Sequence, residues 1–315
     1  MSTASVAPDI RDLLDRFGPE RADQTVSLDE AQRHCRGMAT GHYENFPVLS
    51  LAVPGDLRQD RANVYAFCRW ADDLGDEIDS PQESMALLEW WQRELDTCFQ
   101  GEAWHPVFVA LRETIRNRNL SQKPFDDLLS AFRQDQSKQS YETFAELHDY
   151  CRRSADPVGR IVLRLCGRDS AENIARSDAV CTGLQLINFW QDVARDFDRG
   201  RVYLPVEDRR RFGYADDDLQ SRRTTSAFQK LMEFEVDRAR NLLREGQSLA
   251  DGMPGRLKIV IGMFALGGLR LCDHLAAMDY HVWDRRPTVG GGDAARILGL
   301  AAARAVQSYF RRTRR

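Results

Sequence analysis

Apolar residues recur along most of this chain at the three- and four-residue spacing that places them on one face of an α-helix. Between about residues 60 and 76, for example, Val64, Phe67, Cys68 and Ala71 follow this spacing. Further helices are predicted at about 27–41, 81–100, 105–118, 124–135, 141–154, 157–167, 171–197, 224–250, 254–282 and from 293 onward. Alternating strand patterns are nearly absent. The sequence therefore predicts an all-α protein.

Capping residues delimit two of these helices. Ser27 and Glu30 have the spacing of a capping box, in which each side chain bonds the backbone of the other residue. Ser80 is a suitable N-cap, Pro81 suits the first turn, and Gly101 suits the end of the same helix. The helix from 81 to 100 is therefore the best delimited in the sequence.

The domain organisation predicted from these patterns is simple. No Gly/Ser-rich or Pro-rich linker divides the chain, and no internal repeat appears. Several helices are apolar on all sides, which suits a large bundle around a central cavity. We expect a loose polar arm at 1–25, one catalytic helical domain at 26–310 and a basic tail at 311–315.

Composition narrows the class of protein. The chain has 315 residues, of which 43% are hydrophobic and 29% charged, as in soluble globular proteins. The net charge of −4 provides no basic field for nucleic acid, so we expect no such partner. Seven scattered cysteines without a CxxC pair suit reduced thiols in the cytoplasm.

Membrane contact is expected to be peripheral at most. The longest apolar run, 259–269, covers about half of the roughly 20 residues that a membrane helix needs. The tail from Arg311 to Arg315 is either a frayed end or a weak attachment to anionic lipid. We expect a cytoplasmic protein, with peripheral contact to the inner membrane left open.

Two of the predicted helices carry acidic or amide side chains four residues apart. Asp72 and Asp76 form one ladder, and Asn188, Asp192 and Asp196 form another, because residues i and i+4 share a helix face. Like charges at this spacing destabilise a helix by roughly 0.2–0.5 kcal/mol per pair. One such run is often a solvated helix end. Two runs on apolar helices favour buried sites that hold a cation between the carboxylates.

The donor type in the ladders indicates the cation and the reaction. Mg²⁺ prefers oxygen ligands and is usually held by carboxylates together with substrate phosphates. Two ladders facing each other across a cavity would hold Mg²⁺ ions, which neutralise a diphosphate and make it a leaving group. The resulting carbocation needs a dry pocket. Asp73 and Glu77, offset by about 100° around the helix, are expected at the rim of the site.

The motifs around both ladders resemble those of one family. The run Tyr-Ala-Phe-Cys-Arg-Trp-Ala-Asp-Asp at 65–73, continued to Asp76, is similar to the first aspartate motif of the squalene/phytoene synthases. The run Leu-Gln-Leu-Ile-Asn at 184–188, continued through Asp196 and followed by Gly-Arg-Val-Tyr-Leu-Pro at 200–205, resembles the second. The resemblance extends from about 34 to 298. It implies the all-α isoprenoid-synthase fold and a head-to-head prenyl-diphosphate enzyme.

The resemblance also assigns residues. It implies that Mg²⁺ and diphosphate are held by Asp72, Asp76, Asn188, Asp192 and Asp196. It implies further substrate contacts from His42, Asn45, Phe46, Arg69, Gln191, Arg201, Tyr203 and Tyr280.

The chain departs from the family's usual pattern at several of these positions. Where most members have His-x-x-Ser-Phe, this chain has Asn45 in place of the serine. Arg152 replaces the tyrosine tied to catalysis in squalene-forming members, and Gln191 replaces a common arginine. The basic residues usual near the final helix are reduced to Gly291 and Ala294.

This combination resembles the bacterial hydroxysqualene synthase branch of the family. The resemblance implies that presqualene diphosphate is ionised and that water captures the rearranged cation, with Arg152 binding the leaving group and holding a water. It also implies functional coupling to a presqualene diphosphate synthase and to a flavin-dependent reductase that forms squalene. Two alternatives remain: a condensing enzyme that makes squalene, dehydrosqualene or phytoene, and a non-catalytic relative.

Overall fold

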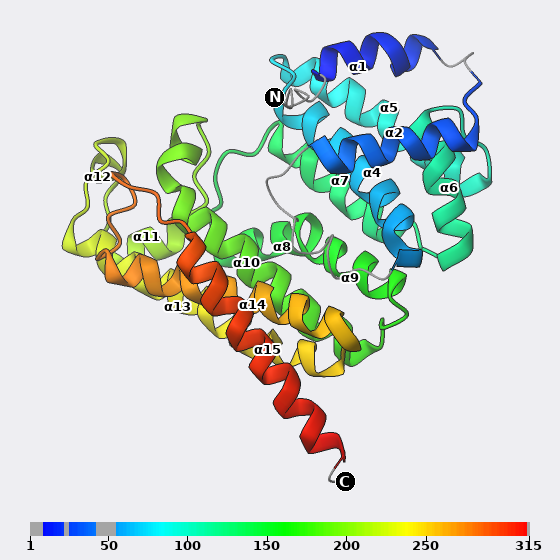
Figure 1. Cartoon of the computed structure of the whole chain (residues 1–315). Helices are drawn as coiled ribbons and strands as arrows, with labels where there is room; N and C mark the ends of the chain where they lie inside the picture. The colour runs from blue at the N-terminus through cyan, green and yellow to red at the C-terminus, as the bar shows by residue number, and fades with distance from the viewer. Residues whose placement is uncertain (1–8, 22–24, 42–54, 314–315) are drawn as a thin grey trace, which may run out of the picture. The chain divides into compact units, whose positions relative to one another are not determined.

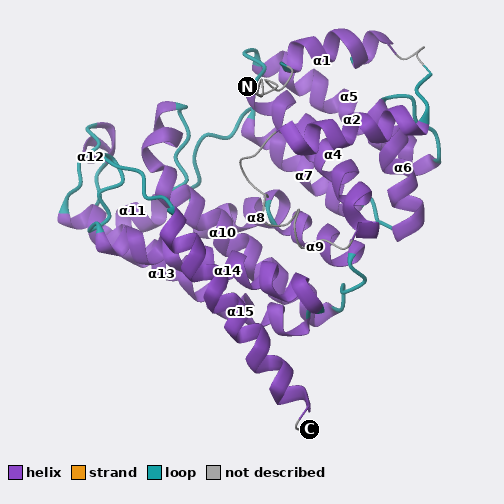
Figure 2. Ribbon diagram, in the orientation of Figure 1, coloured by secondary structure: helices purple, strands orange, loops and turns teal. Residues whose placement is uncertain are grey.

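The structure, a computed structural model, describes residues 9–21, 25–41 and 55–313. Within this part of the chain every regular element is helical, and no strand is present (Figure 2). One isolated bridge pairs Ser140 with Val202. The predicted all-α class is confirmed.

The helices group into two compact units. One comprises residues 1–137 and 161–167, and the other comprises 138–160 and 168–315. The division falls within helix α9 (Asp156–Leu165), between residues 160 and 161. Each unit has its own central helix.

The first unit is built around helix α4. Its helices are α1 (Ile10–Phe17), α2 (Leu28–Gly41), α4 (Arg58–Asp76), α5 (Pro81–Gln100), α6 (Pro106–Arg118) and α7 (Lys123–Asp135), with short 3₁₀ turns at Pro19–Arg21 and Gly55–Leu57. Helix α4 packs against α2, α5, α6 and α7 (Figure 1). Its Trp70 stacks on Trp91 of α5 with ring centres 5.1 Å apart, and its Phe67 lies edge-on to Phe125 of α7 at the same distance. This aromatic core fixes the rotation of α4 about its axis.

Part of the expected N-terminal arm is ordered. The prediction of a loose arm over 1–25 is wrong for helix α1, because Ile10 and Leu13 share one helix face and are buried. The guanidinium of Arg11 also bonds the carboxylate of Glu83 at the start of α5. One short amphipathic helix is thus enough to attach this part of the arm to the first unit.

The predicted helix caps are present. Ser27 and Glu30 form the capping box, with the Ser27 backbone N–H donating to Glu30 at 3.1 Å. The Ser80 hydroxyl accepts from the Glu83 backbone, and Gly101 ends α5 in the left-handed region at φ 103°. The capping residues therefore place these helix ends as the sequence predicted.

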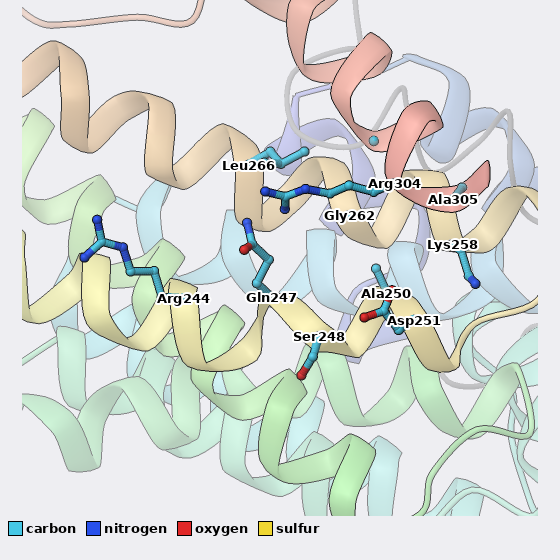
Figure 3. A pocket seen from close by; sticks show the side chains of 11 residues that line it. Arg244, Gln247, Ser248, Ala250, Asp251, Lys258, Gly262, Leu266, Arg304 and Ala305 are labelled. Carbon is cyan, nitrogen blue, oxygen red and sulfur yellow. The ribbon is translucent and has the colours of Figure 1, made fainter. Parts of the chain in front are cut away.

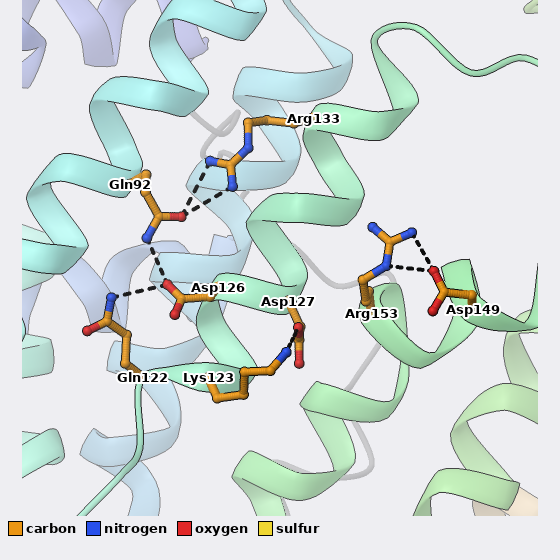
Figure 4. Close-up of polar contacts among 8 residues, drawn as sticks. All are labelled: Gln92, Gln122, Lys123, Asp126, Asp127, Arg133, Asp149 and Arg153. Atoms are coloured by element: carbon orange, nitrogen blue, oxygen red, sulfur yellow. Dashed lines mark hydrogen bonds and ion pairs between the residues drawn. The ribbon is translucent and has the colours of Figure 1, made fainter.

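Polar side chains connect α5 to α7 within the same unit. The amide of Gln92 donates to Asp126 at 2.7 Å, and the amide of Gln122 donates to the same oxygen at 3.2 Å (Figure 4). Arg133 donates to the carbonyl oxygen of Gln92 at 3.4 Å. These bonds hold α7 beside α5 together with the ring contact between Phe99 and Phe125.

The second unit is built around helix α10. Its elements are α8 (Phe144–Ser154), the start of α9, α10 (Ala171–Asp198), α11 (Val206–Phe212), α12 (Asp216–Gln220), α13 (Ser226–Gly246), a 3₁₀ helix η3 (Gln247–Gly252), α14 (Gly255–Ala277) and α15 (Gly291–Thr313). Helix α10 packs against α8, α13 and α14. Helices α11 and α12, which were not predicted, have only 7 and 5 residues and are too short to show a helical period.

Two glycines allow close packing of α10, α13 and α14. A Cβ atom on Gly183 of α10 would lie 2.9 Å from Leu243 of α13. A Cβ atom on Gly268 of α14 would lie 2.8 Å from the same leucine. Leu243 is fully buried, so it has little room to move. The three helices therefore approach each other more closely than a side chain at either glycine would allow.

Helix α14 is longer than the apolar run on which the expectation of no membrane-spanning helix was based. It has 23 residues, and its most apolar 18-residue window has a mean hydropathy of 1.5, so its length and composition would suffice for a membrane span. The prediction considered only the uninterrupted run 259–269. The core helix of a soluble protein can meet the same criteria, so this finding is weak evidence for a span.

Candidate functional site

The first acidic ladder lies at the C-terminal end of α4, in the first unit. Asp72 and Asp76 share a helix face, as predicted, and are respectively half-exposed and exposed. Asp73 instead turns into the protein and is 6% exposed. Glu77 is exposed and donates its backbone N–H to the carbonyl of Asp73 at 2.9 Å, which ends the helix. The carboxylates of Asp72 and Asp76 are therefore accessible to a ligand of this unit.

The guanidinium of Arg69 donates hydrogen bonds to three carboxylates of this motif. Its Nε donates to Asp73 at 3.0 Å, its Nη1 to Asp72 at 3.5 Å and its Nη2 to Glu77 at 2.9 Å. Burial raises the pKa of Asp73 to about 8, against the opposing charge of Arg69 and with a smaller upward contribution from Glu77. Arg69, which the resemblance assigns to phosphate, is in this structure the cation that holds the motif's own acids.

The end of α4 is also fixed by side chains from neighbouring helices. The hydroxyl of Ser84 donates to the carbonyl of Leu74 at 2.7 Å, and the amide of Gln136 donates to the carbonyl of Gly75 at 3.0 Å. These bonds satisfy carbonyls that a helix end leaves without partners. No basic residue lies in the last turn of α4. Each acid there opposes the helix dipole at a cost of about 0.3–1 kcal/mol, so this end favours a bound cation.

The second ladder lies on α10 in the second unit. Asn188 is exposed, whereas Asp192 and Asp196 are half-buried. Arg286, in the loop before α15, binds Asp192 through two parallel bonds of 2.5 Å from Nε and 2.8 Å from Nη2. The adjacent carboxylate raises the pKa of Arg286. The sequence interpretation missed Arg286, and its only local signal is a basic pair next to Pro287.

Gln191 lies beside this ladder. Its amide nitrogen is 3.3 Å from the side-chain oxygen of Asn188 and 3.4 Å from a carboxylate oxygen of Asp192. Gln191 is buried. In place of the arginine that the family usually has, an uncharged amide thus donates to two of the expected ligand residues.

The turn after α10 brings three predicted residues together. The carbonyl of Asp196 accepts the backbone N–H of Arg201 at 2.8 Å, and Gly200 provides the left-handed residue of this turn at φ 76°. A narrow crevice of about 10 Å³, enough for about one water, is lined by Asp196, Arg201 and Tyr203, with Trp283 from the loop before α15. Tyr203 is held in place by Phe189, whose ring lies 3.7 Å away and nearly parallel.

Arg152 lies on α8, the helix that carries Tyr150 of this aromatic cluster. Tyr150, two residues earlier, places its ring 6.1 Å from Tyr203. The guanidinium of Arg152 is exposed, and it adds to the burial that lowers the pKa of His148 on the same helix. The structure thus places Arg152 on the same helix as a ring that contacts the turn after α10.

Asp156 is a buried acid that the sequence interpretation did not single out. It is 2% exposed and accepts a 2.8 Å bond from the hydroxyl of Thr182 on α10. Burial raises its pKa to about 7, although Thr182 and Arg160 act in the opposite direction. An acid followed by Pro157 at a helix start is an ordinary pattern in sequence, so no local signal marked this acid as buried.

The remaining predicted residues are not joined to the ladders in the described structure. Tyr280 adopts a left-handed conformation with φ 59°, and the charges acting on it include Glu233 and Asp237 of α13. Residues Trp283 and Arg286 of the same loop contact the site instead. The expected flap residues His42, Asn45 and Phe46 lie outside the described residues.

The ladders fit a hard divalent cation by the chemistry of their donors. They offer carboxylate and amide oxygens, which are the ligands that Mg²⁺ prefers. Within the described residues, no three or more His, Cys, Asp or Glu side chains are gathered around one point as a complete metal site. Each ladder therefore provides a partial set, which suits a cation that shares its coordination with phosphate and water.

Comparison with known proteins identifies the family. Residues 39–293 match the model of the squalene/phytoene synthases. The chain belongs to the squalene/phytoene synthase family. Among the relatives of this family member is a 15-cis-phytoene synthase from Synechocystis, 30% identical over 282 residues that cover 85% of this chain and 83% of that protein.

Solved structures of the family agree with the fold. Squalene synthase HpnC from Alicyclobacillus acidocaldarius is 43% identical with a TM-score of 0.77, over 80% of this chain and 95% of that one. A dehydrosqualene synthase in complex with a ligand is 25% identical with a TM-score of 0.79, over 89% of this chain and 98% of that one. The predicted family and isoprenoid-synthase fold class are confirmed, and the chain is an enzyme of this family.

Proposed function

We propose that this family member is a hydroxysqualene synthase, which converts presqualene diphosphate and water into hydroxysqualene and diphosphate. The observation that carries the proposal is Arg152, an exposed guanidinium where squalene-forming members have a tyrosine. Its helix, α8, also carries Tyr150, whose ring contacts the Tyr203 that borders the crevice beside Asp196 and Arg201. The 43% identity to the squalene synthase HpnC supports a product of the squalene type.

The residues of this chain suit a reaction in which a diphosphate leaves. Asp72 and Asp76 on α4, and Asn188, Asp192 and Asp196 on α10, would hold Mg²⁺. When bound, Mg²⁺ would neutralise the charge of the diphosphate and assist its departure. The carbon–oxygen bond breaks with its electron pair going to the diphosphate, and the oxygen of water then bonds to the carbocation.

Arg152 acts on the anion and on water in this proposal. A guanidinium only donates hydrogen bonds, so it can hold a diphosphate oxygen and orient a water through the water's oxygen. It cannot accept the proton that the water loses after attack. That proton passes to the departing diphosphate, the strongest base that the reaction itself supplies.

The experiment uses purified protein, presqualene diphosphate and Mg²⁺ in water enriched in ¹⁸O, without a nicotinamide cofactor. Hydroxysqualene carrying one ¹⁸O atom is the expected product. Arg152→Ala should lower turnover and increase the share of hydrocarbon side products, whereas Arg153→Ala, which removes the neighbouring guanidinium, should leave the product ratio unchanged. Wild-type turnover and product ratio in Arg152→Ala would contradict the role of Arg152.

A second candidate is a condensing enzyme that joins two farnesyl or geranylgeranyl diphosphates. The 30% identity to a phytoene synthase and the 25% identity to a dehydrosqualene synthase support it. Incubation with farnesyl diphosphate, and separately with geranylgeranyl diphosphate, each with and without NADPH as the hydride donor that squalene formation needs, separates the two. A C30 or C40 hydrocarbon from either substrate would establish this candidate and overturn the hydroxysqualene assignment.

We also propose that the enzyme works in the cytoplasm, in peripheral contact with a membrane, between a presqualene diphosphate synthase and a flavin-dependent reductase. The long apolar substrate and product support this location, because both partition into lipid. Carbonate extraction of cell membranes tests it: release of the protein is expected, and retention in the pellet would favour a span by α14 (Gly255–Ala277).

A further inference from the structure

A second cavity lies in the second unit, away from both ladders. It has a volume of about 410 Å³ and lies where the end of α13, the 3₁₀ helix η3, α14 and α15 meet (Figure 3). Its lining residues are Arg244, Gln247, Ser248, Ala250, Asp251, Lys258, Gly262, Leu266, Ala301, Arg304 and Ala305. None of them belongs to the acidic ladders or to the crevice after α10.

Small residues create this hollow. Ala250 of η3, Gly262 of α14, and Ala301 and Ala305 of α15 all line it. A Cβ atom placed on Gly262 would lie 3.6 Å from Ala250 and 3.8 Å from Ala301, so a larger side chain at this position would enter the space. Leu266 and Ala301 are buried in the apolar cluster that joins α14 to α15. One wall of the cavity is therefore apolar.

The rim of the cavity is positively charged. Arg244, Lys258 and Arg304 line it together with a single acid, Asp251. Figure 3 shows the side chain of Arg304 extending from α15 toward Gln247 and Leu266, so that a cation lies over the apolar wall.

We propose that this cavity binds the phosphate group of an amphiphile, with the phosphate at the basic rim and the first carbons of the apolar chain against Leu266 and Gly262. Three cations against one acid suit an anion, and guanidinium groups bind phosphate oxygens in pairs. An inorganic ion would leave the apolar wall exposed to water. The volume is within the range of small-molecule sites, about 300–1,000 Å³. The proposal does not depend on the function proposed above.

The direct test is calorimetric titration with dihexanoyl phosphatidic acid, a short-chain phosphate amphiphile, below its micelle concentration and in EDTA so that the ladders hold no cation. The wild type should bind saturably and at least about tenfold more tightly than it binds inorganic phosphate, since tenfold corresponds to 1.4 kcal/mol. Arg304→Glu should weaken binding by about tenfold or more, because it replaces a guanidinium that donates to the phosphate with a carboxylate that repels it.

Three further variants test whether binding occurs in this cavity. Arg296→Glu makes the same charge change at an exposed position of α15 that does not line the cavity, and should change the affinity by less than about twofold. Asp192→Asn alters the acidic ladder and should also leave the affinity unchanged. Gly262→Leu fills the cavity and should abolish binding, and its circular dichroism must match that of the wild type for it to count.

Two further titrations identify the source of the phosphate. The first is co-sedimentation with phosphatidylglycerol vesicles. If the protein sediments with them, and this is lost in Arg304→Glu but kept in Arg296→Glu, the source is a lipid head group. Binding of farnesyl monophosphate without vesicle binding would identify a soluble isoprenoid phosphate. The proposal would be overturned if no saturable binding occurred, or if inorganic phosphate bound as tightly as phosphatidic acid. It would also be overturned if Arg304→Glu and Arg296→Glu weakened binding equally, or if Asp192→Asn abolished binding.

Discussion

The substitution Asp156→Asn should stabilise the protein at alkaline pH and have little effect at acidic pH. Asp156 is 2% exposed and has a pKa of about 7, raised from an ordinary value of 3.8 mainly by burial. Between pH 4 and 7 the folded protein therefore holds a proton that the unfolded chain has released. Stability falls as pH rises through this window, because the unfolded chain binds fewer protons there.

The size of this effect follows from the shift. About three pKa units at 1.36 kcal/mol each give an upper bound of about 4 kcal/mol lost between pH 4 and 7. Asparagine stays neutral at every pH, and its amide oxygen can still accept the bond from the Thr182 hydroxyl. The difference in unfolding free energy between Asp156→Asn and the wild type should thus be near zero at pH 4.5 and should rise by about 1–4 kcal/mol by pH 8.

Urea unfolding followed by circular dichroism at pH 4.5, 6 and 8 measures this difference. Asp149→Asn is a matched control, because Asp149 pairs with Arg153 on the exposed surface of α8 (Figure 4) and its loss should cost less than about 1 kcal/mol. Thr182→Val removes a bond that lowers the pKa of Asp156, so it should extend the pH-dependent loss to higher pH. A constant difference between Asp156→Asn and the wild type across the three pH values would refute the reasoning.

Three further outcomes are expected. Gly183→Ala should lower the unfolding free energy by about 1–3 kcal/mol, because its Cβ would lie 2.9 Å from a buried leucine, whereas Gly299→Ala on α15, with nothing within 4 Å, should not destabilise; urea unfolding measures both. Arg286→Ala should raise the KM for the diphosphate substrate about tenfold, because the diphosphate loses the guanidinium that would pass to it from Asp192 when a metal binds, and Arg285→Ala should change KM less than twofold; equal effects would contradict the specific role. Arg152→Ala should reduce incorporation of ¹⁸O into product relative to hydrocarbon, as measured by mass spectrometry of the extracted lipids.

Local signals predicted much of the fold. The helix period and the caps at Ser27, Ser80 and Gly101 placed helix ends within a few residues of those in the structure. The helical spacing is in fact present in α1, where Ile10, Leu13, Leu14 and Phe17 follow it, but the run covers only eight residues and was therefore overlooked. Short helices such as α12 depend on tertiary packing and leave little trace in sequence.

Part of the candidate site could likewise be predicted from the sequence, and part of it could not. The face shared by Asp72 and Asp76 follows from helix geometry, so the sequence was sufficient to predict it. The bonds between Arg286 and Asp192 join residues 94 positions apart, and no helical period connects them. The turn of Asp73 into the protein depends on how α4 packs against its neighbours, which the spacing of the acids did not specify.

Arg69 and Arg286 bind carboxylates of the two ladders and therefore affect how a cation binds there. Asp72 is 3.5 Å from Arg69, and Asp192 accepts two bonds from Arg286. A divalent cation at either ladder must therefore compete with a guanidinium that already neutralises the carboxylate. Binding becomes an ion exchange, whose equilibrium depends on ionic strength and on the anion that arrives with the metal. A diphosphate that accepts the released arginine favours the exchange, so metal and substrate should each strengthen the binding of the other.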